Sequence, residues 1–193
     1  MPRPRVADRR DRILDAAEAL VLALGFDAMS VAGIAERAGI GKGAVYLEFA
    51  GKREILDAVL QRGTARMNDR VRDELGENPR LSAAYRASAR ALSSDALMTA
   101  AFLDDRGLLG EHVAEITDGR YRERQRRVVA WLHDLQERGE IVPDVDVEAL
   151  ALALSSASIG LLSAARLLGP IDPAQLERAI DTIGRMAETF ERN

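Results

Sequence analysis

Residues 30–49 read SVAGIAERAGIGKGAVYLEF and contain two short helical patterns separated by Gly39. In the first pattern, apolar residues recur at helical spacing after Ser30, which is a favourable residue for a helix N-cap. Ala35 is small enough for two helix backbones to approach, Gly39 tolerates the positive φ of a tight turn, and Val45 closes a shared core. This spacing is typical of a helix-turn-helix, although glycine-containing helical hairpins also occur in other proteins. The motif favours DNA binding.

The flanking residues extend this pattern on both sides. Residues 8–24 carry an apolar stripe, and Gly25 stands where a left-handed helix cap belongs. The run from Arg12 to Leu60, RILDAAEALVLALGFDAMSVAGIAERAGIGKGAVYLEFAGKREILDAVL, resembles the N-terminal DNA-binding domain of the tetracycline-repressor (TetR) family. The resemblance has no gap over this run. Beyond it, only the helical pattern agrees with the family.

The resemblance implies an all-α protein with a helix-turn-helix DNA-binding domain in residues 1–54 and a ligand-binding and dimerisation domain in residues 55–193. The exposed positions of the second helix are mostly small, which allows its backbone to lie close to base edges. From these small residues and from the resemblance, we expect DNA contacts from Ser30, Gly41, Lys42, Gly43, Ala44, Tyr46, Leu47 and Lys52.

For several of these positions the sequence predicts a specific kind of contact. Lys52 is expected to anchor a phosphate, although a cation in the first turn of a helix opposes the helix dipole. Gly41 stands where the family often has serine, and Leu47 where it often has histidine or another polar or aromatic residue. Leu47 then offers an apolar contact to a thymine methyl group. Glu48 is interpreted as a solvated acid, with a contact to cytosine as the alternative.

The composition is that of a soluble protein with a buried core, because 47% of the residues are hydrophobic and 30% are charged. The absence of cysteine excludes disulfides, cysteine zinc sites and thiol nucleophiles. The polar N-terminus lacks the apolar region of a signal peptide, which predicts a cytoplasmic protein. Residues 1–53 hold nine basic and seven acidic residues, whereas the whole chain has a net charge of −4. The prediction of DNA binding therefore depends on the placement of charges. The basic N-terminal arm, residues 1–7, is either a DNA contact or a solvated tail.

From residue 52 onward the sequence predicts one helix after another. We expect helices over residues 52–75, 80–103, 111–139, 147–168 and 174–192, with a candidate interruption of the second at 93–95. Asp146 and Asp172 are expected to cap the last two helices, and Pro173 to take the first helical position.

The helix expected over residues 147–168 has no charged residue between Glu148 and Arg166. Its serines argue against a membrane span, and burial on all sides requires a second chain to cover its outer face. We therefore expect a two-fold dimer seam with the last helix, involving Ala153, Ala157, Gly160, Ala164, Ile180 and Ile183. The alternative is a core helix of a monomer.

The resemblance also implies a small-molecule pocket among the middle helices. The side chains suited to line it are Tyr85, Met98, Phe102, Tyr121 and Trp131, although each of them is also an ordinary core residue. With few polar residues on these faces, an apolar or weakly polar effector is expected. The arginine-rich run over residues 120–127 is interpreted as a solvated face, with an anion site as the alternative.

An enzyme is not expected. The two histidines, His112 and His133, do not form a catalytic zinc site, and no phosphate loop, nucleophile elbow or dinucleotide fingerprint is present. No metal or cofactor is predicted. The sequence thus predicts a homodimeric regulator, a repressor rather than an activator, that binds a near-palindromic operator in double-stranded DNA and is released by a small effector. The alternative is a dimeric DNA-binding factor with no effector.

Overall fold

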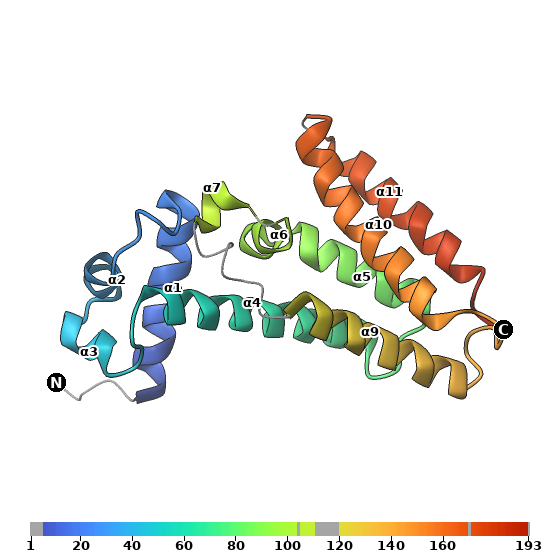
Figure 1. Ribbon diagram of the computed structural model, residues 1–193, viewed down its shortest axis with the longest axis horizontal. Helices are drawn as coiled ribbons and strands as arrows, with labels where there is room; N and C mark the ends of the chain where they lie inside the picture. The colour runs from blue at the N-terminus through green and yellow to red at the C-terminus, as the bar shows by residue number, and fades with distance from the viewer. Residues whose placement is uncertain (1–5, 104, 111–119, 170, 193) are drawn as a thin grey trace. The chain divides into compact units, whose positions relative to one another are not determined.

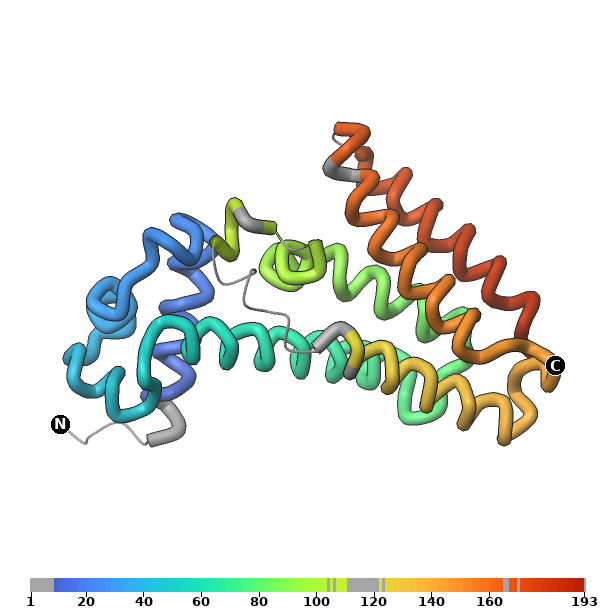
Figure 2. Tube along the Cα trace, viewed as in Figure 1, coloured from blue at the N-terminus to red at the C-terminus, as the bar shows by residue number. Residues whose placement is uncertain are grey.

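The computed structural model describes residues 6–103, 105–110, 120–169 and 171–192. Within these ranges every regular element is a helix (Figure 1, Figure 2). An isolated β-bridge pairs Ile141 with Glu191. The helices are α1 (Val6–Leu24), α2 (Val31–Ala38), α3 (Lys42–Tyr46), α4 (Lys52–Leu75), α5 (Leu81–Ser93), α6 (Ala96–Phe102), α7 (Arg106–Leu109), α9 (Arg120–Glu137), α10 (Val147–Leu167) and α11 (Pro173–Glu188). The prediction of an all-α protein is confirmed.

Several helix ends follow the capping chemistry indicated by the sequence. The Asp146 carboxylate accepts a backbone N–H of α10 at 3.0 Å, and the Asp172 carboxylate accepts one of α11 at 3.2 Å. Pro173 is at the start of α11, and α4 has the bounds expected for the connecting helix. The helix expected over residues 111–139 is described from Arg120 onward, because 111–119 lie outside the described residues.

The helix expected over residues 80–103 is interrupted between α5 and α6. The Ser93 hydroxyl donates to the Arg90 carbonyl at 3.1 Å, and the Ser94 hydroxyl donates to the Ala91 carbonyl at 3.0 Å. Serine hydroxyls that bond to carbonyls of the preceding turn compete with the backbone, and they favour the end of a helix. The interruption expected at residues 93–95 is therefore found between α5 and α6, and both serine hydroxyls have partners in the last turn of α5.

The contacts between residues divide the chain into two compact units. The first unit comprises Met1–Arg66 and Ala96–Ile116, and the second comprises Met67–Asp95 and Thr117–Asn193. The domain boundary expected between residues 54 and 55 falls in the first turn of α4. As a division of function, that boundary stays a prediction.

The core of the first unit is formed by α1, α2, α3, α4, α6 and α7. Its fully buried side chains include Ile13, Ile34, Val45, Ile55 and Leu109. Gly25 adopts a φ of +79° directly after α1, and Phe26 is buried in the same core. This arrangement is the left-handed cap that the sequence predicts, and it sets the direction in which the chain enters α2.

In the second unit, α5 packs against α11 and α9 packs against α10. The Arg86 side chain of α5 crosses α11 at Gly184, where a Cβ atom would overlap the guanidinium group. Arg86 pairs with Glu188 at 2.7 Å, and Arg90 pairs with Glu177 at 2.7 Å. At this contact between α5 and α11, Gly184 leaves room for the Arg86 side chain, and the ion pairs lie on either side of it.

A cluster of charged side chains joins α1 to α4 inside the first unit. Arg62 donates to Asp15 at 2.7 Å and to Glu18 at 2.9 Å, and Arg66 donates to Glu18 at 2.7 Å. Burial alone would raise the pKa of Glu18, but the hydrogen bonds and charges of Arg66 and Arg62 outweigh burial and lower it below the ordinary value. Folding therefore favours the charged form of this carboxylate.

The substitution Glu18→Gln is expected to lower the free energy of unfolding at pH 7 by about 1.5–3 kcal/mol, the scale of hydrogen bonds to charged groups. Because the Glu18 pKa is lower in the folded than in the unfolded chain, the stabilisation is complete above the unfolded pKa. It declines as the pH falls through the folded pKa. Urea unfolding should therefore show a difference in the free energy of unfolding between wild type and variant that narrows as the pH falls below the ordinary pKa of a glutamate.

The matched control is Asp69→Asn, which removes the exposed partner of Arg72 within the same helix. An exposed pair of this kind contributes little, so the control should change the free energy of unfolding by less than about 0.5 kcal/mol. Equal losses in the two variants would contradict the role given to Glu18.

Candidate nucleic-acid interface

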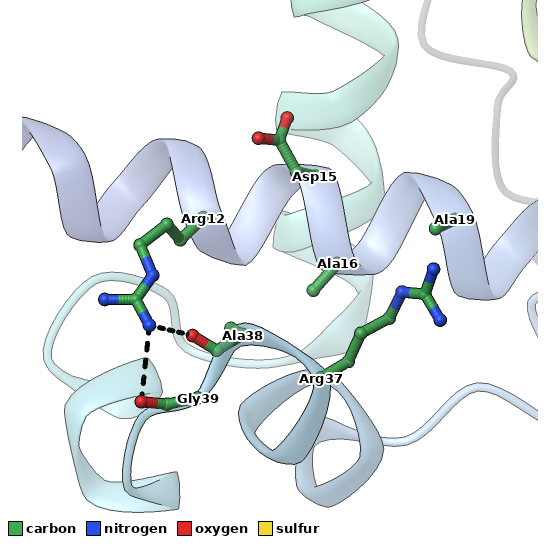
Figure 3. Close-up of a pocket in the computed structure, with 7 residues that line it drawn as sticks. All are labelled: Arg12, Asp15, Ala16, Ala19, Arg37, Ala38 and Gly39. Carbon is green, nitrogen blue, oxygen red and sulfur yellow. Dashed lines mark hydrogen bonds between the residues drawn. The ribbon is translucent and has the colours of Figure 1, made fainter.

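Backbone hydrogen bonds, helix caps and one arginine of α1 stabilise the turn of the helix-turn-helix. The Ser30 hydroxyl accepts the Gly33 N–H at 3.1 Å and so caps α2. Gly39 ends α2 with a φ of +63°, as predicted, and its carbonyl accepts a hydrogen bond of 3.3 Å from Arg12. The same guanidinium group also donates to the Ala38 carbonyl (Figure 3). Arg12 therefore fixes the turn to α1, a role that the sequence did not indicate.

A surface depression of about 400 Å³ lies beside this turn, between α1 and α2. Its lining consists of Arg12, Asp15, Ala16, Ala19, Arg37, Ala38 and Gly39. Figure 3 shows Arg12 turned toward the end of α2, while Arg37 extends toward Ala19. Arg12 and Asp15 already have partners within the protein. We assign no ligand to this depression.

The exposed side of α3 carries the residues expected to contact DNA. A Cβ atom added at Gly41 or at Gly43 would have no other atom within 4 Å. Tyr46 and Leu47 are 50% and 77% exposed, and the Lys42 ammonium lies 5.9 Å from the centre of the Tyr46 ring. Ala44 is half-buried. The result is a short helix with an open backbone and three long side chains beside it.

The end of α3 is tied to the start of α1. The Arg9 Nε donates to the Glu48 carboxylate at 2.8 Å, and the Glu48 side chain is 12% exposed. The interpretation of Glu48 as a solvated acid is therefore wrong, because an ion pair from a distant part of the sequence covers it. The guanidinium group of Arg10 lies 4.3 Å from the centre of the Phe49 ring.

Lys52 has partners inside the protein. Its ammonium group donates to the carbonyls of Phe26 and Asp27 at 3.1 Å each and to that of Met29 at 3.3 Å. These three residues belong to the loop between α1 and α2. The sequence placed Lys52 at the start of a helix but gave no sign of this loop contact.

The residues expected to line an effector pocket are divided between the two units. Met98 and Phe102 lie in the first unit, whereas Tyr85 and Trp131 lie in the second. Tyr121 belongs to α9, and its side chain is outside the described part of the structure. A cavity of about 520 Å³ in the second unit has a different lining, drawn from α4, α5, α11 and the residues before α11. The expected set remains a prediction.

Tyr85 is buried between α5, α10 and α11, in a cluster with Ala89 and Ile180. Burial raises the pKa of Tyr85, and the nearby Ser158 hydroxyl acts in the opposite direction without cancelling the effect. The Ser158 hydroxyl donates to the Leu154 carbonyl at 3.2 Å. Within the described residues, the Tyr85 hydroxyl has no partner in hydrogen-bonding geometry.

The residues expected at a dimer seam lie on α10 and α11. Ala153 and Gly160 are exposed, Ala157, Ala164 and Ile183 are half-buried, and Ile180 is buried in its own unit. The exposed side of α10 also presents Leu152, 61% exposed, and Ile159, which sequence reasoning did not single out. Val147–Ala164 has the length and hydropathy of a membrane span, which alone is weak evidence for one.

Comparison with known proteins identifies similar chains. The family model described as bacterial regulatory proteins, tetR family, matches residues 13–59. The chain is 35% identical over 96 residues to the HTH-type transcriptional repressor KstR of Rhodococcus jostii, an alignment that covers 49% of this chain and 45% of KstR. It is 29% identical over 150 residues to the repressor KstR2 of Mycobacterium tuberculosis, with 75% of this chain and 74% of KstR2 covered. The alignment with KstR thus spans less than half of that relative.

Solved structures with the same arrangement of helices extend the similarity to almost the whole chain. GusR of Salmonella enterica matches with a TM-score of 0.70 and 26% identity, over 96% of both chains. The SmeT–triclosan complex matches with a TM-score of 0.73 and 23% identity, over 96% of this chain and 92% of that chain. At this level of identity, the second match shows the fold alone.

Proposed function

Because the chain belongs to the TetR family of transcriptional regulators, we propose that it acts as a homodimeric repressor whose two α3 helices bind a near-palindromic operator. A small, weakly polar effector would release it from the DNA. The observation that carries the proposal is the exposed side of α3, where two glycines leave the backbone open beside Lys42, Tyr46 and Leu47. We place this activity in the cytoplasm and include no catalytic step.

The proposed DNA contacts follow from the exposure and chemistry of these side chains. Lys42 provides a cation for a phosphate or a guanine edge, and Tyr46 provides a hydroxyl on a rigid ring. Leu47 offers an apolar surface, which suits the methyl group of a thymine in the major groove. Ser30, at the start of α2, and Ala44 complete the surface that faces DNA. Lys52 is set apart, because its ammonium group already has three partners.

A second copy of the chain is the proposed occupant of the exposed side of α10. This side joins Leu152 and Ile159 to the small residues Ala153 and Gly160, which permit a close approach of helices. Ile180 is buried in its own unit, so it would hold α11 in place beneath the seam instead of contacting the second chain. In such a dimer, the two α3 helices would meet half-sites about one helical turn apart or slightly more.

The effector is proposed to bind among the middle helices, near Tyr85 and Trp131. SmeT was solved as a complex with triclosan, and KstR2 of Mycobacterium tuberculosis is a ketosteroid transcriptional regulator. Both cases support a small, weakly polar effector for this chain. The second candidate is a dimeric DNA-binding factor without an effector. The cavity of about 520 Å³ in the second unit favours this second candidate, because its lining contains neither Tyr85 nor Trp131.

Selection of bound sequences from a random DNA library tests the proposal. The expected result is one enriched motif with two inverted half-sites, bound by one dimer. Failure to enrich any motif would contradict the operator, and a single half-site bound by one chain would contradict the dimer. With the motif in hand, a library of weakly polar compounds is screened for release. The absence of release by every compound favours the factor without an effector.

A further inference from the structure

The Lys52 ammonium group lies against the loop between α1 and α2. It donates to the carbonyls of Phe26, Asp27 and Met29, and it lies 4.5 Å from the centre of the Phe26 ring. An ammonium group has three N–H donors, and here three carbonyls accept hydrogen bonds from it. A phosphate contact would have to displace at least one of these carbonyls.

The surroundings of this cation explain why it is stable without DNA. Lys52 is the first residue of α4, where the helix dipole disfavours a positive charge. Three carbonyl dipoles and the face of the Phe26 ring provide the negative potential that offsets this effect. The charge is therefore satisfied inside the protein.

The loop held by Lys52 leads directly into the DNA-reading helices. Met29 precedes Ser30, the N-cap of α2, and α2 packs on α3 in the core of the first unit. An anchor at Met29 therefore sets where α2 begins relative to the first turn of α4. On the basis of the proposed DNA-binding function, we infer that Lys52 is a positioning residue, which holds the α1–α2 loop on α4 and orients α2 and α3 instead of binding phosphate.

Salt dependence distinguishes the two roles. Lys52→Met keeps the aliphatic stem and removes the ammonium group, so it is expected to weaken operator binding about tenfold, the scale of one charge-assisted hydrogen bond. The slope of log K against log salt concentration should equal that of wild type, because no phosphate contact is lost. The matched control Lys42→Met removes an exposed cation of α3 and should reduce the slope by about one unit.

Restoration by arginine is the second arm of the test. A guanidinium group can donate several hydrogen bonds to the same carbonyls, so Lys52→Arg should bind within about twofold of wild type with an unchanged slope. A Lys52→Met variant with full affinity, or with a slope reduced by about one unit, would overturn the positioning role.

Wild-type protein provides a measurement that does not depend on the stability of a variant. The chain has two lysines, Lys42 and Lys52, so acetylation by an amine-reactive ester and mass spectrometry can follow each one. We expect rapid acetylation of Lys42 in the free protein and protection of it by operator DNA. Lys52 should react slowly in both states. Rapid acetylation of Lys52 that DNA suppresses would overturn the positioning role.

The same experiments separate this role from the proposed function. If wild-type protein binds no specific DNA, the proposed function fails, while slow acetylation of Lys52 in the free protein still reports the anchor. If wild type binds and the slope of Lys52→Met falls, the proposed function stands and Lys52 is a phosphate contact.

Discussion

Gly43→Glu is expected to lower operator affinity at least about 100-fold while the protein becomes slightly more stable. Gly43 lies within α3, and a Cβ atom there would have no other atom within 4 Å, so the fold accommodates a side chain. Replacing a helical glycine by a better helix former raises the free energy of unfolding by about 0.5–1 kcal/mol. The same side chain would fill the space that base edges need, and its charge would face the phosphates.

Two further variants separate the effect of side-chain size on operator affinity from the effect of charge. Gly43→Ala should gain a similar stability and lose less affinity, because a methyl group fills less of the space. Ala130→Glu adds the same charge on an exposed position of α9 and should leave affinity unchanged. Affinity is measured by fluorescence anisotropy at one salt concentration, and stability by thermal unfolding. Full operator binding by Gly43→Glu would show that α3 does not enter the groove.

Leu152→Arg is expected to dissociate the proposed dimer and, as a consequence, to weaken operator binding at least about 100-fold. In the single chain Leu152 is 61% exposed, so an arginine there disturbs no contact of its own subunit. In the proposed seam, two copies of the guanidinium group would be brought into an apolar interface without partners. A chain without its partner would bind one half-site and lose the contribution of the second.

Leu24→Arg is the matched control, because Leu24 is 59% exposed on α1 of the first unit. Light scattering after size exclusion should report the mass of one chain for Leu152→Arg and of two chains for Leu24→Arg. Circular dichroism should show equal helix content in both. A Leu152→Arg variant that remains dimeric would place the seam on another surface.

Local chemistry made much of the fold predictable. Gly39, Asp146 and Asp172 act within a few residues of their own position, so the turn and the helix caps could be predicted from the sequence. The bounds of α4 were predicted for the same reason, since Leu75 is followed by glycine and proline within four residues.

Contacts between distant parts of the chain were not predicted. Arg12 is 26 residues from Ala38, Lys52 is 23 residues from Met29, and Arg9 is 39 residues from Glu48. The sequence around a basic residue of an amphipathic helix looks the same whether its side chain contacts solvent, a phosphate or a carbonyl group of the protein. The partner of each basic side chain depends on how the helices of the first unit pack. That packing could not be predicted from a single sequence.

The crossing of Arg86 over Gly184 limits how parts of this protein can be exchanged with those of its relatives. The two positions are 98 residues apart in the sequence, yet a side chain at one occupies the volume left vacant by the other. In a chimera that takes α11 from a homologue with a larger residue at this crossing, the Arg86 side chain would have to move, and its ion pair with Glu188 would be disturbed. Exchanging α5 and α11 together from one donor keeps this contact intact.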